Sequence, residues 1–304
     1  MTDLGTHPLV QDEPPAALPR LSVIVPCFNH GDTLGGQLEA LVGQDYAGWW
    51  EVIVADNGST DHSRTVAETY VGRLPRFRVV DASLRRGASY ARNTGASAAE
   101  GDFLLFCDAD DEVGDDWLPA VAAAFRHNDF VASSVEIGRL NEPWVQQVRR
   151  PPTPGERLSF PPYLAHAGGS GLGVRRELFE AVSGFDESFP RLQDTDFCIR
   201  VQLTGTPLVF APDAVIHCRY QTSWLEIYRQ ARSYAEGAAR IYAQYAPNGA
   251  HRPHWWRWPL RHWFAIVKAA SRAWDVGSRA QLAWVLGWQV GRLRASLRYR
   301  VPAV

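Results

Sequence analysis

The chain has 304 residues, 46% of them hydrophobic, which is enough apolar material for one large core with or without an appendage. Its four cysteines lie far apart and form no Cys-x-x-Cys pair. This disfavours a disulfide framework or a zinc site and indicates buried thiols in a reducing compartment. No window approaches the roughly 18 uncharged apolar residues that a membrane-spanning helix needs.

The net charge of −2 conceals an uneven distribution along the chain. Residues 251–304 hold ten Arg or Lys residues and one acid, a charge of +9, so the first 250 residues carry −11. Seven of the twelve tryptophans also lie in this last segment. The composition therefore predicts a disordered leader over 1–20, which lacks the apolar run of a signal peptide, and then a domain over 21–245. A basic, aromatic, helical appendage is expected over 246–304.

From residue 21 onward, apolar runs alternate at short spacing with segments of helical periodicity. The predicted strands cover 21–26, 50–55, 76–81 and 102–107. The predicted helices cover 34–42, 61–71, 87–100 and 115–127. Apolar runs without polar alternation are typical of strands that are buried on both faces. We therefore expect an α/β fold, with a mostly parallel sheet covered by helices on both faces.

The regular alternation fades after the fourth helix. Residues 139–168 are rich in Pro and Arg and lack a clear period, which predicts a surface excursion with at most a short strand or two. Regularity returns with a further strand and the segment RREL, followed by a helix over 194–205. Short strands over 207–211 and 214–218 and a long helix over 223–245 are expected to complete the domain.

The segment LLFCDADDE, residues 104–112, places four carboxylates within five positions directly after a predicted strand. Like charges crowded at a strand end repel one another and resist burial. Asp108 and Asp110 are spaced to hold a hard divalent cation, Mg²⁺ or Mn²⁺, whose open positions a diphosphate would complete. The alternative is a cluster that caps the helix near Asp115, to which the later acids, Asp111 included, would belong.

Four polar segments occur in order along the chain, and in such a sheet the ends of neighbouring strands meet. They are VPCFNHGDTL, VADNGSTD, GASYARN with LLFCDADDE, and GFDESFPRLQDTDFCIRVQLTG. Each motif alone is weak, but the ordered set is specific. The set resembles the GT-A fold glycosyltransferases of family 2 over residues 21 to about 220. That resemblance implies an inverting reaction with a nucleotide-diphosphate sugar as donor.

The resemblance also implies donor-binding roles for individual residues. Side chains at the end of the first strand would border the nucleotide: Pro26, Phe28 and Asn29. Asp56 would accept a hydrogen bond from the nucleobase, with Ser59 and Asp61 shaping that turn, although DNGSTD also suits a turn and helix cap. Arg92 would offer its donors to the pyrophosphate, the alternative being a solvated surface arginine. Asp108 would serve both the nucleotide and the cation.

Asp194 aligns with the general base of the family. It would deprotonate an acceptor hydroxyl, which attacks the anomeric carbon from the face opposite the diphosphate. The chain departs here from the family's Glu-Asp pair, since Gln193 precedes the aspartate. The alternative role for Asp194 is a helix cap, and Asp196 and Arg200 are expected to pair on that helix as structural support. His217 would reach the metal or the diphosphate, or else be a structural histidine.

The appendage contains two predicted amphipathic helices, over 259–274 and about 279–298. The apolar stripe of the second consists of Leu282, Leu286, Leu293 and Leu297. Basic helices with Trp and Phe at the apolar edge suit the surface of an anionic membrane, which predicts membrane contact through 255–298. The alternative is that these stripes pack on the core and the arginines face water. Nucleic acid is not an expected partner, because the rest of the chain is acidic and has no recognition module.

The sequence thus predicts a metal-dependent inverting glycosyltransferase. It would move a sugar from a nucleotide-diphosphate sugar to an acceptor hydroxyl, on a membrane-associated or lipid-linked acceptor, in the cytoplasm or at the inner face of the membrane. A nucleotidyltransferase would need a Gly-rich basic loop after the first strand, and PCFNHGD has one glycine and no Lys or Arg. The other alternative is a non-catalytic nucleotide-sugar-binding module anchored at a membrane, to which Gln193 gives some support. No sequence feature identifies the donor sugar, the nucleobase or the acceptor.

Overall fold

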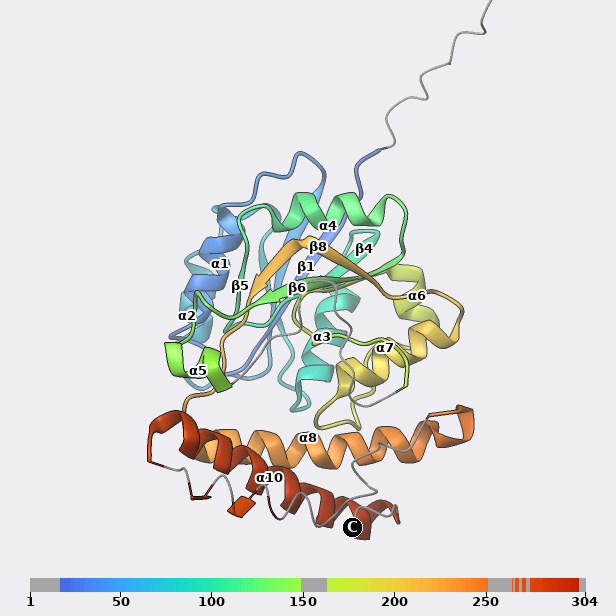
Figure 1. The fold of residues 1–304 in the computed structure, drawn as a ribbon. Coiled ribbons are helices and arrows are strands. Elements are labelled where there is room, and N and C mark those ends of the chain that lie inside the picture. Colours follow the sequence, from blue (N-terminus) through green and yellow to red (C-terminus); the bar gives the residue numbers. More distant parts are fainter. Residues whose placement is uncertain are drawn as a thin grey trace, which may run out of the picture.

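The computed structural model describes residues 17–148, 163–250, 264, 266–267, 270–271 and 274–300. Within these residues the chain forms an eight-stranded sheet with the order β3-β2-β1-β4-β7-β6-β8-β5 (Figure 1). The strands are β1 Leu21–Cys27, β2 Trp50–Asp56, β3 Arg78–Asp81, β4 Phe103–Phe106, β5 Glu112–Val113, β6 Phe130–Glu136, β7 Leu172–Arg175 and β8 Val209–His217.

The first half of the sheet is entirely parallel and confirms the four strands predicted first. β1 lies between β2 and β4, and β2 pairs with β3. In this register Cys27 lies opposite Asp56, which in turn lies opposite Asp81, so these three strands end at one level. In the second half, β7 is antiparallel to β4 and β6, while β8 is parallel to β6 and antiparallel to β5.

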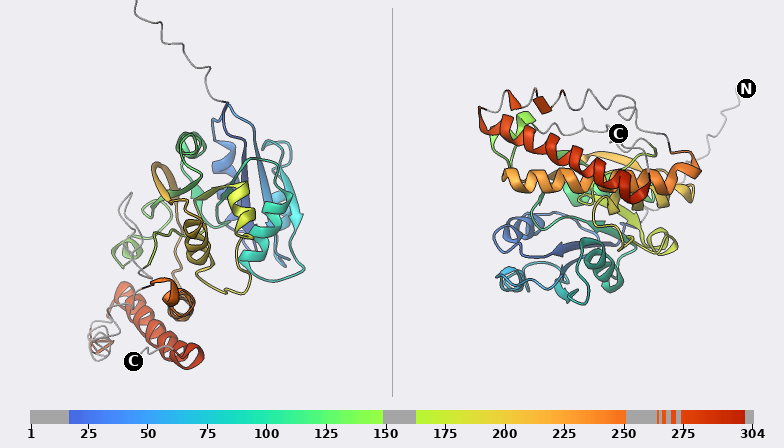
Figure 2. Two further views of the ribbon diagram at one scale, coloured as in Figure 1. Left: turned by 90° about the vertical axis from the view of Figure 1, so that its right-hand side faces the viewer. Right: turned by 90° about the horizontal axis from the view of Figure 1, so that it is seen from below.

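Helices cover both faces of the sheet, as the unbroken apolar runs predicted (Figure 2). On one face, Val23 and Val25 of β1 share a core cluster with residues of helices α1 and α4. On the other face, Ile24 of the same strand shares a second cluster with residues of α6 and α7. Successive side chains of a strand point to opposite faces, so an uninterrupted apolar strand supplies both clusters. The helices of this body are α1 Leu34–Val42, α2 Ser63–Glu68, α3 Ala88–Ala98, α4 Trp117–Phe125, α6 Arg176–Ala181 and α7 Gln193–Leu203.

The structure differs from the expected elements in the second half of the sheet. No apolar run or simple period in the sequence predicted β6, although it is one of the longer strands of the sheet. Within the predicted excursion 139–168, the described residues include a short helix, α5 Pro143–Val148, which the sequence did not indicate, and residues 149–162 lie outside the described part. The two strands expected at 207–218 are a single strand, β8. Its pairing with β6 shifts register: Ser133 lies opposite Ala211, but Ser134 lies opposite Val215. The apolar pattern of β8 is interrupted between Ala211 and Val215, so one strand resembled two in the sequence.

The cysteines match the expectation of free thiols. All four are free, and Cys27, Cys107 and Cys198 are buried. Burial in apolar surroundings raises the pKa of Cys107 well above the ordinary value of a thiol, and the charge of Asp108 raises it further. These thiols are therefore core residues with low intrinsic reactivity.

Two long helices, α8 Trp224–Tyr245 and α10 Val276–Tyr299, lie side by side along one side of the α/β body (Figures 1 and 2). A short 3₁₀ turn, Ala246–Asn248, follows α8. The helices approach closely where α10 carries glycine: a Cβ at Gly287 would collide with the carbonyl oxygen of Tyr228. A Cβ at Gly291 would collide with that of Arg232 in the same way. The predicted domain boundary at residue 246 thus falls between two helices that pack against each other.

The face of α10 that packs on α8 is not the leucine stripe. Its buried residues include Ala280, Ala283, Gly287, Gly291 and Ala295. The leucines point outward instead: Leu286, Leu293 and Leu297 are 36%, 40% and 86% exposed. The other predicted helix, over 259–274, lies largely outside the described residues. Over the part of the chain that the structure describes, no helix is both long enough and apolar enough to cross a membrane.

Candidate active site

Three aspartates follow β4 in one tight turn. Carboxylate oxygens of Asp108, Asp110 and Asp111 all lie within 4.8 Å of one another. The backbone N–H of Asp111 donates to the carbonyl oxygen of Asp108 at 3.3 Å, and the N–H of Asp108 donates to Ser170 Oγ at 3.1 Å. Sequence reasoning chose the first two aspartates and left Asp111 to a helix cap. Helix α4 instead begins at Trp117, and its N-cap residue, Asp116, makes no capping hydrogen bond through its side chain.

The aspartates are crowded enough to perturb one another. Burial, and then the charges of Asp108 and Asp110, raise the pKa of Asp111 to about 7. Burial and the charge of Asp108 also raise the pKa of Asp110. Arg219 closes the turn, since its backbone N–H donates to Asp111 Oδ1 at 2.9 Å and its Nε donates to the carbonyl oxygen of Asp110 at 3.1 Å. A set of three hard oxygen ligands, crowded in one turn, fits Mg²⁺ or Mn²⁺, either of which would relieve the repulsion between the carboxylates.

Arg92 of α3 is buried rather than solvated. Its side chain is 3% exposed and forms an ion pair between Nη2 and Asp108 Oδ1. The guanidinium also lies over the ring of Phe185, 5.5 Å from its centroid, while Nε and Nη1 have no hydrogen-bond partner among the described residues. A Cβ at Gly169 would lie only 2.7 Å from Nη2, so the absence of a side chain there makes room for Arg92.

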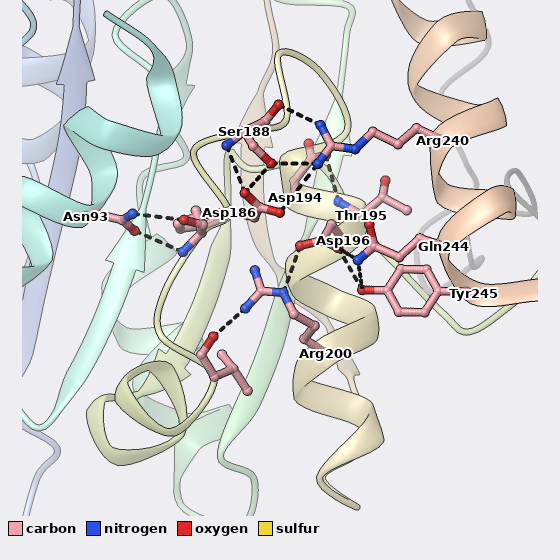
Figure 3. A network of polar contacts seen from close by, with 12 residues as sticks. Asn93, Asp186, Ser188, Asp194, Thr195, Asp196, Arg200, Arg240, Gln244 and Tyr245 are labelled. Carbon is pink, nitrogen blue, oxygen red and sulfur yellow. Dashed lines mark hydrogen bonds and ion pairs between the residues drawn. The ribbon is translucent and has the colours of Figure 1, made fainter. Parts of the chain in front are cut away.

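Asp194 lies in the first turn of α7 (Figure 3). Its Oδ2 accepts a hydrogen bond from the backbone N–H of Gly169 at 3.0 Å, and Oδ1 accepts one from Thr195 N–H at 2.8 Å. Burial raises the pKa of Asp194, and the charge of Arg92 partly offsets this. Gly169 therefore touches both Arg92 and Asp194, so the structure brings the acidic turn, the arginine and the expected base to one place.

The ends of β1 and β2 form a pair of interlocked loops. Asn29 has a left-handed backbone conformation, with φ of 56°, and its Oδ1 accepts from the Thr60 N–H at 2.8 Å. The Asn29 N–H donates to Ser59 Oγ at 3.0 Å, and Asp56 Oδ1 accepts from the Ser59 N–H at 2.9 Å. Asp61 Oδ2 accepts from the Gly31 N–H at 2.9 Å. The turn-shaping roles expected for Ser59 and Asp61 therefore match these contacts.

Three further side chains lie in or beside these loops. Phe28 is 42% exposed, and the guanidinium of Arg86 lies over its ring, 4.3 Å from the centroid. Arg86 also donates from Nη1 to the carbonyl oxygens of Asn57 and Gly58, at 2.8 and 3.0 Å. Pro26 is half-buried within β1, opposite Ala55. Sequence reasoning missed Arg86, and the RR pair before GASYARN was the only signal that could have indicated it.

His217 is near the acidic turn but is engaged elsewhere. It ends β8 opposite Glu112 of β5, and its Nδ1 lies 2.7 Å from Glu136 Oε2. Within the described ranges, the cluster that could hold a metal consists of the three aspartates and does not include His217. Its contact with a metal or a diphosphate stays a prediction.

Comparison with known proteins gives matches over most of the chain. Residues 22–183 match the model of the family described as glycosyl transferase family 2, and residues 157–291 match that of glycosyl transferase family group 2. The uncharacterized glycosyltransferase YibD of Escherichia coli is 40% identical over 94 residues, which are 31% of this chain and 27% of that protein. An N-acetylglucosaminyltransferase of Neorhizobium galegae is 30% identical over 139 residues, 45% of this chain and 32% of that protein. The chain thus spans about a third or less of the length of these two relatives.

A third relative and two solved structures match over longer stretches. A PGL/p-HBAD biosynthesis glycosyltransferase of Mycobacterium bovis is 29% identical over 60% of this chain and 70% of its own. A mannosyltransferase of Pyrobaculum calidifontis, solved with GDP-Man and Mn²⁺, is 20% identical with a TM-score of 0.64, covering 92% of this chain and 88% of its own. Staphylococcus aureus TarS 1-349, solved with UDP, is 18% identical with a TM-score of 0.54, covering 93% and 92%. These likenesses confirm the expected GT-A fold.

Proposed function

Because the chain belongs to glycosyl transferase family 2, we propose that it is a metal-dependent inverting glycosyltransferase. It would move a sugar from a nucleotide-diphosphate sugar to an acceptor hydroxyl. One observation carries this proposal: the aspartate turn and the half-buried Asp194 meet across Arg92 and Gly169. Such a reaction needs these two features together, a site for a cation with a diphosphate and a nearby base.

On the donor side, the interlocked loops after β1 and β2 would bind the nucleoside. Asp56 is the proposed acceptor for a nucleobase N–H. Phe28 and Asn29 lie in the loop after β1 and would border the nucleotide, as would Pro26 near the end of that strand. The mannosyltransferase from P. calidifontis was solved with GDP-Man and Mn²⁺, which supports a donor of this class.

The proposed cation ligands are Asp108 and Asp110, with Asp111 as a third carboxylate of the same cluster. Bound there, Mn²⁺ or Mg²⁺ would supply positive charge to a leaving diphosphate. Arg92 adds a fixed positive charge directly behind Asp108 and keeps that carboxylate in one orientation. Its burial suggests that it acts mainly through Asp108 rather than as an exposed fork for the diphosphate.

Asp194 is the proposed base. Its raised pKa makes the carboxylate a better proton acceptor than an ordinary aspartate, and two backbone N–H groups fix its orientation. The acceptor oxygen would give its proton to Asp194 and form the new bond to the anomeric carbon. The bond from that carbon to the diphosphate oxygen would break on the opposite face, which inverts the configuration.

The outer face of α10 supports a membrane-associated or lipid-linked acceptor. Leu286, Leu293 and Leu297 are exposed on a helix that also exposes Arg294 and Arg298. Apolar side chains flanked by arginines suit an anionic lipid surface, where apolar burial and charge attraction act together. We place the proposed membrane contact on this face, within the predicted segment 255–298.

Calorimetry tests the donor side of this proposal. UDP and GDP should bind more tightly with Mn²⁺ than with EDTA, because the carboxylates and the diphosphate complete the coordination of one cation. Equal affinity in both conditions would rule out the metal site. Slow Mn²⁺-dependent hydrolysis of UDP-GlcNAc or GDP-mannose would support an enzyme, whereas binding without hydrolysis or transfer would favour a non-catalytic binding module.

A further inference from the structure

One face of α8 points toward the segment that carries Asp194 (Figure 3). The residues on this face follow helical spacing: Gly237, Arg240, Gln244 and Tyr245. The opposite side of the helix packs on α10, where Tyr228 and Arg232 meet the two glycines. Helix α8 therefore lies between α10 and the segment 184–196.

The first contact is made to a buried carboxylate. Asp196 is fully buried and lies two residues after Asp194, in the same turn of α7. Its Oδ2 accepts from Arg200 Nε at 2.8 Å, which confirms the pair predicted on this helix. Its Oδ1 accepts from Tyr245 Oη at 2.6 Å and from Gln244 Nε2 at 3.2 Å. A buried charge needs such donors, and α8 supplies two of these three, so the start of α7 is tied to α8.

The second contact lies upstream, in the loop between α6 and α7. Arg240 donates from Nη1 to the carbonyl oxygen of Ser188 and from Nη2 to Ser188 Oγ, both at 2.6 Å. The same guanidinium is 3.6 Å from Asp186 Oδ2 and 3.6 Å from the ring centroid of Phe189. The Arg240 side chain thus contacts three residues of the loop, Asp186, Ser188 and Phe189.

The third contact surrounds the residue just before α7. Leu192 has a left-handed conformation, with φ of 58°, which is uncommon for a residue with a side chain and persists where its surroundings hold it. A Cβ at Gly237 would lie 3.2 Å from Leu192 Cγ, so the glycine lets α8 approach this point. Leu192 also packs in a small cluster with Ile241 and Tyr245.

We infer that Tyr245 and Arg240 are positioning residues for Asp194. Arg240 holds the loop before α7 and Tyr245 holds the first turn of α7. Together they set the position of the Asp194 carboxylate without contacting a substrate. The inference deepens the proposed function, since it rests on Asp194 being the base. It also assigns a role to α8 that the sequence did not suggest.

The experiment compares three variants of the intact chain. Tyr245→Phe removes only the hydroxyl that donates a hydrogen bond to Asp196. Arg240→Met removes both hydrogen bonds to Ser188 but keeps an apolar side chain of similar length. Tyr228→Phe is the matched control, because it removes a tyrosine hydroxyl from the same helix on the side that packs against α10. Hydrogen exchange followed by mass spectrometry reports on the peptides that cover residues 184–197.

We expect those peptides to exchange about tenfold faster in the first two variants and at the wild-type rate in the control. Hydrolysis of UDP-GlcNAc or GDP-mannose with Mn²⁺ gives the second measurement. The kcat should fall about 10- to 100-fold, with the KM for the nucleotide sugar within about twofold of wild type, because the base moves while the donor site does not.

Exchange no faster than in Tyr228→Phe would overturn the inference, and so would a raised KM with an unchanged kcat. If exchange responds as expected but the wild-type chain hydrolyses no nucleotide sugar, the contacts to α8 are confirmed and the proposed function fails instead. The two failures are therefore distinguishable, because exchange is measured without turnover.

Discussion

Asp56 and Asp108 stand at the ends of strands in the parallel half of the sheet, whereas Asp194 stands at the start of a helix beside the mixed half. The pairing of the strands determines the positions of Asp56 and Asp108, because the register of β1 with β2 and β4 fixes where β2 and β4 end. Asp194 is placed by contacts with Gly169 and, through its neighbours, with α8.

The two proposed halves of the site, one for the donor and one for the base, therefore depend on different parts of the chain. The donor half needs the sheet and two interlocked loops. The base half needs a helix that follows it in sequence and that packs on the C-terminal α10. Donor binding and transfer are therefore expected to respond separately to mutation, and the following predictions test this separation.

The largest expected effect comes from Asp194→Asn. Transfer, or hydrolysis of the donor, should fall by about 10²- to 10⁴-fold, because the amide cannot accept the proton from the hydroxyl. Affinity for UDP or GDP with Mn²⁺ should remain near that of wild type, since the donor half is untouched. Asp213→Asn, at an exposed position of β8, is the control. Kinetics close to wild type in Asp194→Asn would mean that this residue only stabilises the first turn of α7.

Asp110→Ala is the complementary variant, which should weaken binding of the cation and the nucleotide without changing the proposed base. Coupling between Mn²⁺ and the nucleotide diphosphate, expected at about 5- to 150-fold in wild type, should nearly vanish. Calorimetry with and without Mn²⁺ measures it, and Asp115→Ala serves as the control because Asp115 is 95% exposed. Coupling that survives in Asp110→Ala would contradict the assignment of this carboxylate to the cation.

The crowded aspartates also predict how stability depends on pH when no cation is present. The pKa of Asp111 is raised from 3.8 to about 7 in the folded chain, so between these values the folded state binds more protons than the unfolded state. The free energy of unfolding should then decrease as the pH rises through this window and level off above pH 7.

Thermal unfolding in EDTA between pH 4 and pH 8 measures this dependence. Asp111→Asn should flatten the decrease in Tm, and Mn²⁺ should raise the Tm of the wild-type chain at pH 8 by binding the native state. An unchanged slope in the variant would show that Asp111 does not titrate in this range.

The smallest expected effect on stability comes from the outer face of α10, which belongs to neither half. Leu293→Glu combined with Leu297→Glu should change the free energy of unfolding by about 0.5 kcal/mol or less, because both side chains are exposed. Sedimentation with anionic vesicles should nevertheless be lost. Leu203→Glu, on an exposed leucine of α7, should retain it. If wild type fails to bind vesicles at low salt, the membrane proposal fails.

Sequence patterns predicted the parallel half well and the mixed half poorly, for a physical reason. Strands buried on both faces leave an unbroken apolar run, and β1, β2 and β4 have such runs. The strand β6 carries Ser133 and Ser134 in its middle, where its pairing with β8 is also irregular, so no simple period marks it.

Within the site, residue type was predictable but pairing was not. The four carboxylates after β4 indicated a cation site, yet only the folded turn shows that Asp111 belongs with Asp108 and Asp110. The hydrogen bond from Tyr245 to Asp196 joins residues 49 positions apart, and local sequence patterns do not indicate such a contact. The leucine stripe of α10 was visible, but the helix packs through glycine and alanine, which a search for large apolar residues overlooks.

Gly169 has a consequence for the spacing of the proposed reaction partners. Its backbone N–H reaches Asp194, and the empty space where a side chain would stand is filled by Arg92, the partner of Asp108. The separation between the proposed cation-binding turn and the proposed base thus depends on one main-chain N–H group and on the room that a residue without a side chain leaves for Arg92. Any side chain at position 169 would have to displace Arg92, and the spacing between the two proposed reaction partners would change with it.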